Sequence, residues 1–137
     1  MRLEITRKTH LALRVVAALA DNEDRVKGAD LAKTVGTSTA FLAQVVTPLV
    51  RRGWIESEPG RSGGYSAVAE PEGISVLELI EAVEGPTEND ICALRGDACS
   101  SVEKCAVHDA WIKTRRGLMD ELAATPVATL ARQEVLL

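Results

Sequence analysis

Apolar residues recur at helical spacing along the first fifty residues of the chain, and polar breaks divide them into three segments. The first predicted helix covers residues 7–19 and ends at the polar stretch DNED, residues 21–24. The second covers about residues 29–35, and Gly36 follows it at the position where a left-handed residue commonly ends a helix. The pattern therefore predicts a helical first third of the chain.

The third segment, TSTAFLAQVVTPLVRRG at residues 37–53, combines an apolar stripe with a face of small and polar side chains. Thr37, Ser38 or Thr39 can cap its start. Pro48 lacks a backbone N–H and clashes with the carbonyl four residues earlier, so we expect a bend or a shortened helix between residues 44 and 48. The stripe comprises Phe41, Leu42, Val45, Val46, Leu49 and Val50, and the opposite face comprises Thr39, Ala40, Ala43, Gln44, Thr47 and Arg51.

Two short helices joined by a glycine-containing turn are typical of a helix-turn-helix. The following stretch, GWIESEPGRSGGYSAV, predicts strands at about residues 54–57 and 65–68 around a tip that carries Arg61. Either piece alone could be ordinary helix packing or an ordinary surface hairpin. In this order, together, they predict a winged helix that contacts DNA.

The same pattern predicts which side chains reach the nucleic acid. The exposed face of the third helix would enter the major groove, where the Gln44 amide can bond two atoms of one adenine. Other polar or basic residues would contact the DNA backbone or extend from the wing. The predicted groove residues are Thr39, Ala40, Gln44 and Thr47, and the predicted backbone and wing residues are Ser38, Arg51 and Arg61.

The second half opens with a well-defined helix and then loses its periodicity. In ISVLELIEAVEGP, residues 74–86, Ser75 and Glu78 form a capping box, Leu77, Ile80 and Val83 are predicted to face inward, and the Gly-Pro pair ends the helix. Residues 86–104 show neither helical nor strand spacing, and so long a loop usually has a functional reason. Helical spacing resumes at about residue 106, and TPVATLARQEV predicts a short last helix.

These elements predict a mostly α fold with a small β wing, a winged helix-turn-helix followed by a long C-terminal dimerisation helix. We divide the chain into a winged helix-turn-helix DNA-binding region at 1–69, a connecting helix at 70–85, a cysteine loop at 86–105, and the dimerisation helix with a short final helix at 106–137. So long a helix cannot bury its apolar face on so small a domain. A homodimer that reads a pseudo-palindromic site in double-stranded DNA is therefore expected.

The net charge of −4 hides a division between the two halves. Residues 1–68 carry ten Lys and Arg against seven Asp and Glu, whereas residues 69–137 carry six against thirteen. The basic half suits a phosphate partner and the acidic half does not. No apolar run approaches the about 20 residues of a membrane span, and the N-terminus lacks a signal-peptide core, so we expect a cytoplasmic protein that does not enter a membrane.

Every cysteine of the chain falls in ICALRGDACSSVEKCAVHDAW, residues 91–111. The three thiols are Cys92, Cys99 and Cys105, with His108 three positions after the last. An odd number of cysteines in a reducing compartment favours metal binding or redox chemistry over a disulfide framework. Their spacing matches neither a zinc ribbon nor a redox CxxC motif.

In this order, MRLEITRKTHLALRVV, PLVRRGWI, GRSGGY, ISVLELIEAVEGP and the three-cysteine loop with HDAW resemble the winged-helix iron–sulfur transcription regulators of the IscR, NsrR and RirA type. The resemblance covers about residues 1–133. It implies a bacterial homodimeric regulator, expected to be a repressor, that binds promoter DNA and senses iron, redox state or nitric oxide. It also implies one [2Fe–2S] or [4Fe–4S] cluster per subunit, ligated by Cys92, Cys99 and Cys105.

The resemblance leaves two histidines as candidates for the fourth ligand. In IscR-like relatives a histidine lies three residues after the third cysteine, where this chain has His108. In NsrR-like relatives an acidic residue on the first helix reaches across the dimer, and here that position is His10. His108 is the preferred prediction because it needs no geometry between subunits, with His10 of the partner subunit as the alternative.

Three other interpretations stay open. A structural zinc site of Cys3His type in the same winged-helix repressor uses the same ligands. A cluster-free thiol redox switch needs the cysteines alone. An enzyme would use Cys105 as nucleophile and His108 as its base, but no substrate pocket or oxyanion hole is indicated, so a non-enzyme is predicted.

Overall fold

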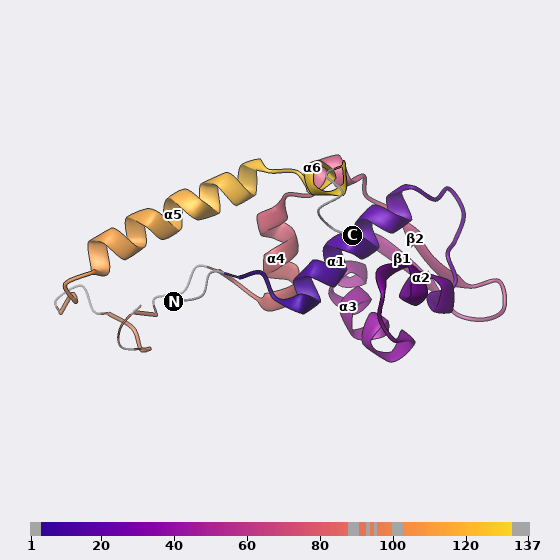
Figure 1. Ribbon diagram of the computed structural model, residues 1–137, viewed down its shortest axis with the longest axis horizontal. Coiled ribbons are helices and arrows are strands. Elements are labelled where there is room, and N and C mark those ends of the chain that lie inside the picture. The colour runs from indigo at the N-terminus through magenta and orange to yellow at the C-terminus, as the bar shows by residue number, and fades with distance from the viewer. Residues whose placement is uncertain (1–3, 88–90, 93, 95, 100–102, 133–137) are drawn as a thin grey trace.

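The computed structural model describes residues 4–87, 91, 92, 94, 96–99 and 103–132. Three helices, α1 (Arg7–Ala20), α2 (Gly28–Val35) and α3 (Thr39–Arg51), precede strands β1 (Ile55–Glu58) and β2 (Gly64–Ala67). The 3-10 helix η1 (Pro71–Gly73) and helices α4 (Val76–Glu84), α5 (His108–Ala124) and α6 (Val127–Arg132) follow. The first three helices and the hairpin gather at one end, and α5 extends away from them as an arm (Figure 1). The mostly helical fold with a two-stranded wing confirms the predicted fold class.

Helix α1 lies at the centre of the core and contacts α2, α3, α4 and α6. The hydroxyl of Thr6 caps it by accepting a hydrogen bond from the Thr9 backbone N–H. Its buried apolar side chains recur at helical spacing, and burial of each leucine or valine among them stabilises the fold by about 1.5–3 kcal/mol. They are Leu11, Ala12, Leu13, Val15, Val16 and Leu19.

Helix α3 continues through Pro48 to Arg51, so the predicted shortening between residues 44 and 48 is wrong. Proline in a helix interior costs about 3 kcal/mol through one lost hydrogen bond and a steric clash. Val45, Val46 and Leu49 surround the proline and are all fully buried. Their burial outweighs that cost because each side chain contributes about 1.5–3 kcal/mol.

The wing is an antiparallel hairpin in which Ile55 pairs with Ala67 and Glu58 pairs with Gly64. Both strands lie within one residue of their predicted positions. Val26, in the connection between α1 and α2, exchanges two 2.8 Å backbone hydrogen bonds with Tyr65 and so fastens the wing to the helices. Arg25 adds an ion pair of 3.0 Å to Glu58 on β1.

Helix α4 begins with the predicted capping box. The Ser75 backbone donates to Glu78 Oε2 at 2.8 Å, and the Glu78 backbone donates to Ser75 Oγ at 3.1 Å. Ile80 is buried and Val83 packs against the core, as predicted, but Leu77 is only half-buried. Val76 and Leu79 take the place predicted for Leu77, on the face of α4 that packs against α1 and α3.

The end of the described chain returns to the winged helix. Val76 donates to the Thr125 carbonyl and Val127 donates to the Ile74 carbonyl, each at 2.8 Å. These bonds seat α6 beside α1, with Val127 fully buried. In contrast, no residue of α5 is fully buried, and Leu118 is 46% exposed.

Protonating Glu78 is expected to weaken the start of α4. Hydrogen bonds from the Ser75 backbone and hydroxyl hold the pKa of the Glu78 carboxyl below its ordinary value of 4.5. Because the folded pKa lies below the unfolded one, this contribution to the free energy of unfolding is complete above about pH 4.5 and is lost as the pH falls through the folded pKa. In urea unfolding, the stability difference between wild type and Glu78→Gln should shrink from pH 5 towards about pH 3. Stability curves of wild type and Glu78→Gln that stay parallel over this pH range would contradict the assignment.

Candidate metal centre and nucleic-acid interface

The cysteine loop carries local backbone order around its first thiol. Ile91 and Ala98 form an isolated antiparallel bridge, and the Cys92 backbone donates to the Asp97 carbonyl at 2.7 Å. Gly96 closes the turn with a left-handed φ of 73°, which glycine adopts without a steric cost. This turn directs Cys92 inward, where it is only 5% exposed.

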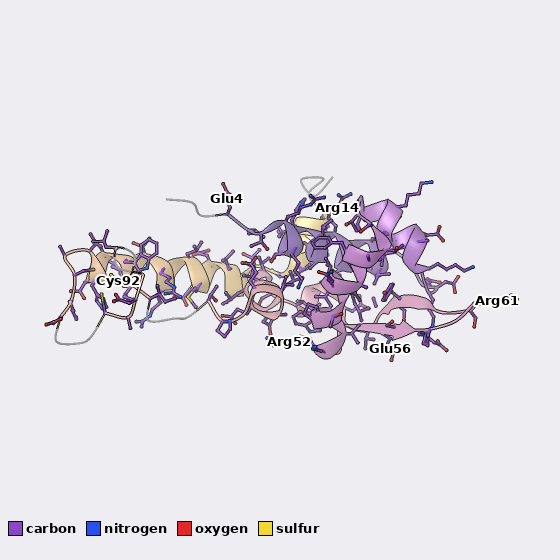
Figure 2. The ribbon with its side chains drawn as sticks, turned by 90° about the horizontal axis from the view of Figure 1, so that it is seen from below. Glu4, Arg14, Arg52, Glu56, Arg61 and Cys92 are labelled. Atoms are coloured by element: carbon purple, nitrogen blue, oxygen red, sulfur yellow. The ribbon has the colours of Figure 1, made fainter. Side chains whose placement is uncertain are left out.

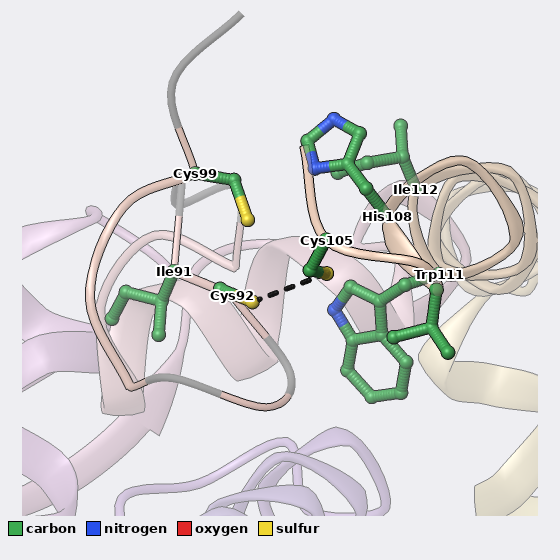
Figure 3. A pocket seen from close by; sticks show the side chains of 8 residues that line it. Ile91, Cys92, Cys99, Cys105, His108, Trp111 and Ile112 are labelled. Atoms are coloured by element: carbon green, nitrogen blue, oxygen red, sulfur yellow. Dashed lines mark hydrogen bonds between the residues drawn. The ribbon is translucent and has the colours of Figure 1, made fainter. Parts of the chain in front are cut away.

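The three thiols converge on one pocket at the start of α5. The Sγ atoms of Cys92 and Cys105 lie 3.5 Å apart, and all three Sγ atoms lie within 4.8 Å of one another. The His108 backbone donates to the Cys105 carbonyl at 3.0 Å, so the first turn of α5 holds the third cysteine in place. Figure 3 shows the thiols facing one another beside the indole of Trp111.

The walls of this pocket are largely apolar. Ile91, Val107, Trp111 and Ile112 line it together with the thiols, around a cavity of about 40 Å³. A hydrogen bond from the Cys105 backbone lowers the pKa of the Cys99 thiol, but the Cys92 side chain, desolvation and the Cys105 thiol raise it, and the balance lies above the ordinary value. Three thiolates so close together repel one another, and a bound cation would remove that repulsion.

The donor set fits a thiolate-held metal group. Thiolates are the preferred ligands of zinc and of iron–sulfur clusters. A tetrahedral ion with metal–sulfur bonds of about 2.3 Å holds its sulfur ligands about 3.8 Å apart. The 3.5 Å between Cys92 and Cys105 lies close to that spacing. Among the described residues, these three cysteines form the group with metal-binding geometry.

The two histidines occupy different places. His108 opens α5 and lines the thiol pocket, although its ring is not among the ligand atoms that lie within 4.8 Å of one another (Figure 3). His10 is exposed on α1 and does not line that pocket within its own subunit. The fold of one chain therefore brings His108, and not His10, to the cysteines.

Helix α3 presents the predicted DNA-contacting face to solvent. Ser38 caps the helix by accepting a hydrogen bond from the Phe41 backbone at 3.2 Å. The Thr47 hydroxyl donates to the Ala43 carbonyl at 2.7 Å, and the residue is exposed. The exposed residues of this face include Ser38, Thr39, Ala40, Gln44, Thr47 and Arg51.

A groove of about 310 Å³ lies between α3 and the wing. Ser57 and Tyr65 line it from the wing, and the hairpin register places them opposite each other. Sequence reasoning did not propose these two residues, although the alternation of side chains along β1 and β2 could have indicated them. Arg61 is exposed at the tip of the wing, at the opposite end of the molecule from Cys92 (Figure 2).

Across the described part of the chain, no helix has both the length and the apolar character to span a membrane. An exposed helix-turn-helix face beside a hairpin wing, carried with a separate three-thiol pocket, defines a winged-helix transcription regulator. The chain belongs to the Rrf2 family, described as iron-dependent transcriptional regulators, whose family model matches residues 5–133. Members of this family regulate transcription and are not enzymes.

Individual relatives of this chain are also named as transcriptional regulators. A putative HTH-type transcriptional regulator of Aquifex aeolicus is 32% identical over 90% of this chain and 88% of its own length. The regulator IscR of Escherichia coli is 30% identical over 88% of this chain and 72% of its own. Among solved structures, CymR, the global cysteine regulator of Bacillus subtilis, superimposes with a TM-score of 0.75 at 28% identity, covering 96% of this chain and 98% of its own.

Proposed function

We propose that this protein is a transcription repressor whose operator binding is controlled by an iron–sulfur cluster held by Cys92, Cys99 and Cys105. The observation that carries the proposal is the convergence of the three Sγ atoms within 4.8 Å on a chain that also presents a winged helix. The description of the family as iron-dependent supports iron as the metal. When bound, the cluster would supply a group whose gain or loss reports on iron, redox state or nitric oxide.

An anaerobic preparation tests the proposal directly. A brown protein with matching iron and sulfide content, whose operator affinity changes when the cluster is removed, is the expected result. A colourless protein free of iron and sulfide would overturn the cluster, and an operator affinity that does not depend on metal content would overturn the regulation.

The spacing of the thiols favours a second candidate, a single zinc ion in a Cys3His site. Sulfur ligands of one tetrahedral ion lie about 3.8 Å apart, whereas a cluster distributes its ligands over several iron atoms and holds some of them further apart. The 3.5 Å between Cys92 and Cys105 matches the single ion. Zinc has no visible spectrum, so colour combined with elemental analysis separates the two metals.

The same 3.5 Å distance also suits a cluster-free thiol switch. Two thiols at this distance need only a small movement to reach the about 2.05 Å bond of a disulfide. Anaerobic protein that holds no metal, but whose operator affinity responds to reversible thiol oxidation, would identify this mode.

We propose His108 as the fourth ligand. Replacing His108 with alanine should shift the visible spectrum of the anaerobically purified protein and weaken metal retention, because His108 lines the thiol pocket. His10→Ala, which alters the other histidine of the chain, is the matched control and should leave the spectrum unchanged. The opposite pattern would assign the ligand to His10 of the partner subunit.

On the DNA side, we propose that α3 reads bases while the wing contacts phosphate. Gln44 is exposed on α3 and its amide can bond adenine. Thr39, Ala40 and Thr47 would lie beside it in the groove, with Ser38 and Arg51 near the backbone. Pairing of two copies through α5, which buries none of its residues within one chain, would place two such helices on a pseudo-palindromic site.

Arg61→Ala is expected to weaken operator binding and to reduce its dependence on salt. Arg61 is exposed at the wing tip (Figure 2), and losing one phosphate contact lowers the slope of log K against log salt by about 1. Fluorescence anisotropy across a salt series measures both quantities. Arg132→Ala removes an exposed arginine from α6 and should leave the slope unchanged. An unaltered slope in Arg61→Ala would show that the wing makes no such contact.

A further inference from the structure

The carboxylate of Glu84 joins the last turn of α4 to the first turn of α1. The Thr6 backbone donates to Glu84 Oε1 at 3.2 Å and the Thr6 hydroxyl donates to the same oxygen at 2.8 Å. The Thr9 hydroxyl donates to it as well. These residues lie more than seventy positions apart in the sequence, so the bonds connect two separate segments of the chain.

Glu84 and Thr6 lie at the surface of this junction, and its third member lies beneath them. Thr9 is completely buried and is the one buried polar side chain among the described residues. Burial raises the pKa of the Glu84 carboxyl, but the hydrogen bonds from Thr9 and Thr6 together lower it by more. The pKa of Glu84 therefore lies below its ordinary value. The carboxylate is therefore ionised near neutral pH, and hydrogen bonds to an ionised acceptor are about twice as strong as neutral ones.

The position of Glu84 relates it to both candidate sites. It is the last residue of α4, and the next residues, Gly85 and Pro86, enter the cysteine loop. Thr87 is fastened back to α4, since its backbone donates to the Glu81 carboxylate at 3.1 Å. On the other side, α1 packs against both α2 and α3, which form the helix-turn-helix. Glu84 therefore lies between the start of the cysteine loop and α1, which it contacts through Thr6 and Thr9.

We infer that Glu84, with Thr6 and Thr9, forms the mechanical connection through which the metal state of the cysteine loop changes the position of α1 and thereby operator affinity. The inference rests on the proposed function. Glu84, Thr6 and Thr9 are positioning residues, since they act through α1 and do not line the thiol pocket. Without these hydrogen bonds the protein should still bind metal and DNA, but its operator affinity should no longer depend on whether metal is bound.

The test compares operator affinity of the metal-loaded and metal-free full-length protein by fluorescence anisotropy. In wild type the two affinities should differ, and in Glu84→Gln their ratio should move about tenfold closer to one, since the glutamine amide accepts the same bonds without charge assistance, a loss that changes an equilibrium by about that factor. Iron and sulfide content should stay at the wild-type level. Glu72→Gln is the charge-removing control, because Glu72 lies on η1 and pairs with Arg132 instead of the cysteine loop or α1, and it should keep the wild-type ratio.

Amide hydrogen exchange gives an independent readout. Removing the metal should change exchange at the first turn of α1 in wild type, and Glu84→Gln should abolish that change. If Glu84→Gln does not fold, Thr9→Val removes one donor at constant shape and Thr9→Ser retains it, so the first should lose the coupling and the second should keep it. A wild-type ratio far from one that Glu84→Gln retains would overturn this inference alone. A wild-type ratio of one would overturn it together with the proposed function.

Discussion

Replacing Cys92 with serine is expected to abolish metal loading of the anaerobically purified protein. Cys92 is the buried thiol of the three, and its Sγ lies 3.5 Å from that of Cys105. A serine hydroxyl stays protonated at neutral pH and is a poor ligand for the metals that thiolates select. Changes in the partners around metal ligands alone reduce affinity by about 10–100-fold, so losing a direct ligand should exceed about 100-fold. Iron, zinc and sulfide analysis of the purified variant measures the loss.

The same variant should retain its fold and its basal affinity for DNA. Cys92 lies outside the cluster of buried residues that forms the core around α1. Circular dichroism and thermal unfolding of the metal-free variant should therefore match those of metal-free wild type. Ser66→Ala, a partly exposed position on β2 far from the thiols, is a control for handling and should load metal normally. A Cys92→Ser protein with full metal content would place the metal elsewhere.

Periodicity predicted the helical part of the fold because each helix carries its information locally. The apolar stripe of α1, the left-handed Gly36 after α2 and the Ser75–Glu78 capping box all act within a few residues, and the structure confirms each of them. Pro48 misled the prediction, since its local cost is offset by burial of Val45, Val46 and Leu49 against other helices. Tertiary packing of this kind is absent from a local pattern.

The residues of the candidate sites could be predicted from local sequence, whereas the contacts that bring them together could not. Cysteine spacing singled out the three thiols. Their approach within 4.8 Å depends on the turn at Gly96 and on the hydrogen bond from the His108 backbone to the Cys105 carbonyl. The bonds from Thr6 and Thr9 to Glu84 were outside the reach of any pattern, because they exist only when α1 packs against α4.

Replacing Gly63 with alanine is expected to displace the wing and to reduce operator affinity by about tenfold or more. A Cβ atom at Gly63 would lie 2.1 Å from the Glu58 carbonyl oxygen and 2.7 Å from two atoms of the Pro59 backbone. Real Cβ atoms do not approach backbone this closely, so the turn that joins β1 to β2 has to open. Overpacking of a tight site costs about 1–3 kcal/mol, and 1.4 kcal/mol already corresponds to tenfold in an equilibrium.

The displacement should stay confined to the wing, since the core packs mainly around α1 and the hairpin tip is exposed. We therefore expect Gly63→Ala to retain its metal content and most of its thermal stability while losing operator affinity and part of the salt dependence that Arg61 contributes. Gly73→Ala is the matched control, because a Cβ there meets nothing within 4 Å and its backbone φ is not in the left-handed range. Wild-type operator affinity in Gly63→Ala would mean that the wing takes no part in DNA binding, and the DNA contacts would then have to come from α3 alone.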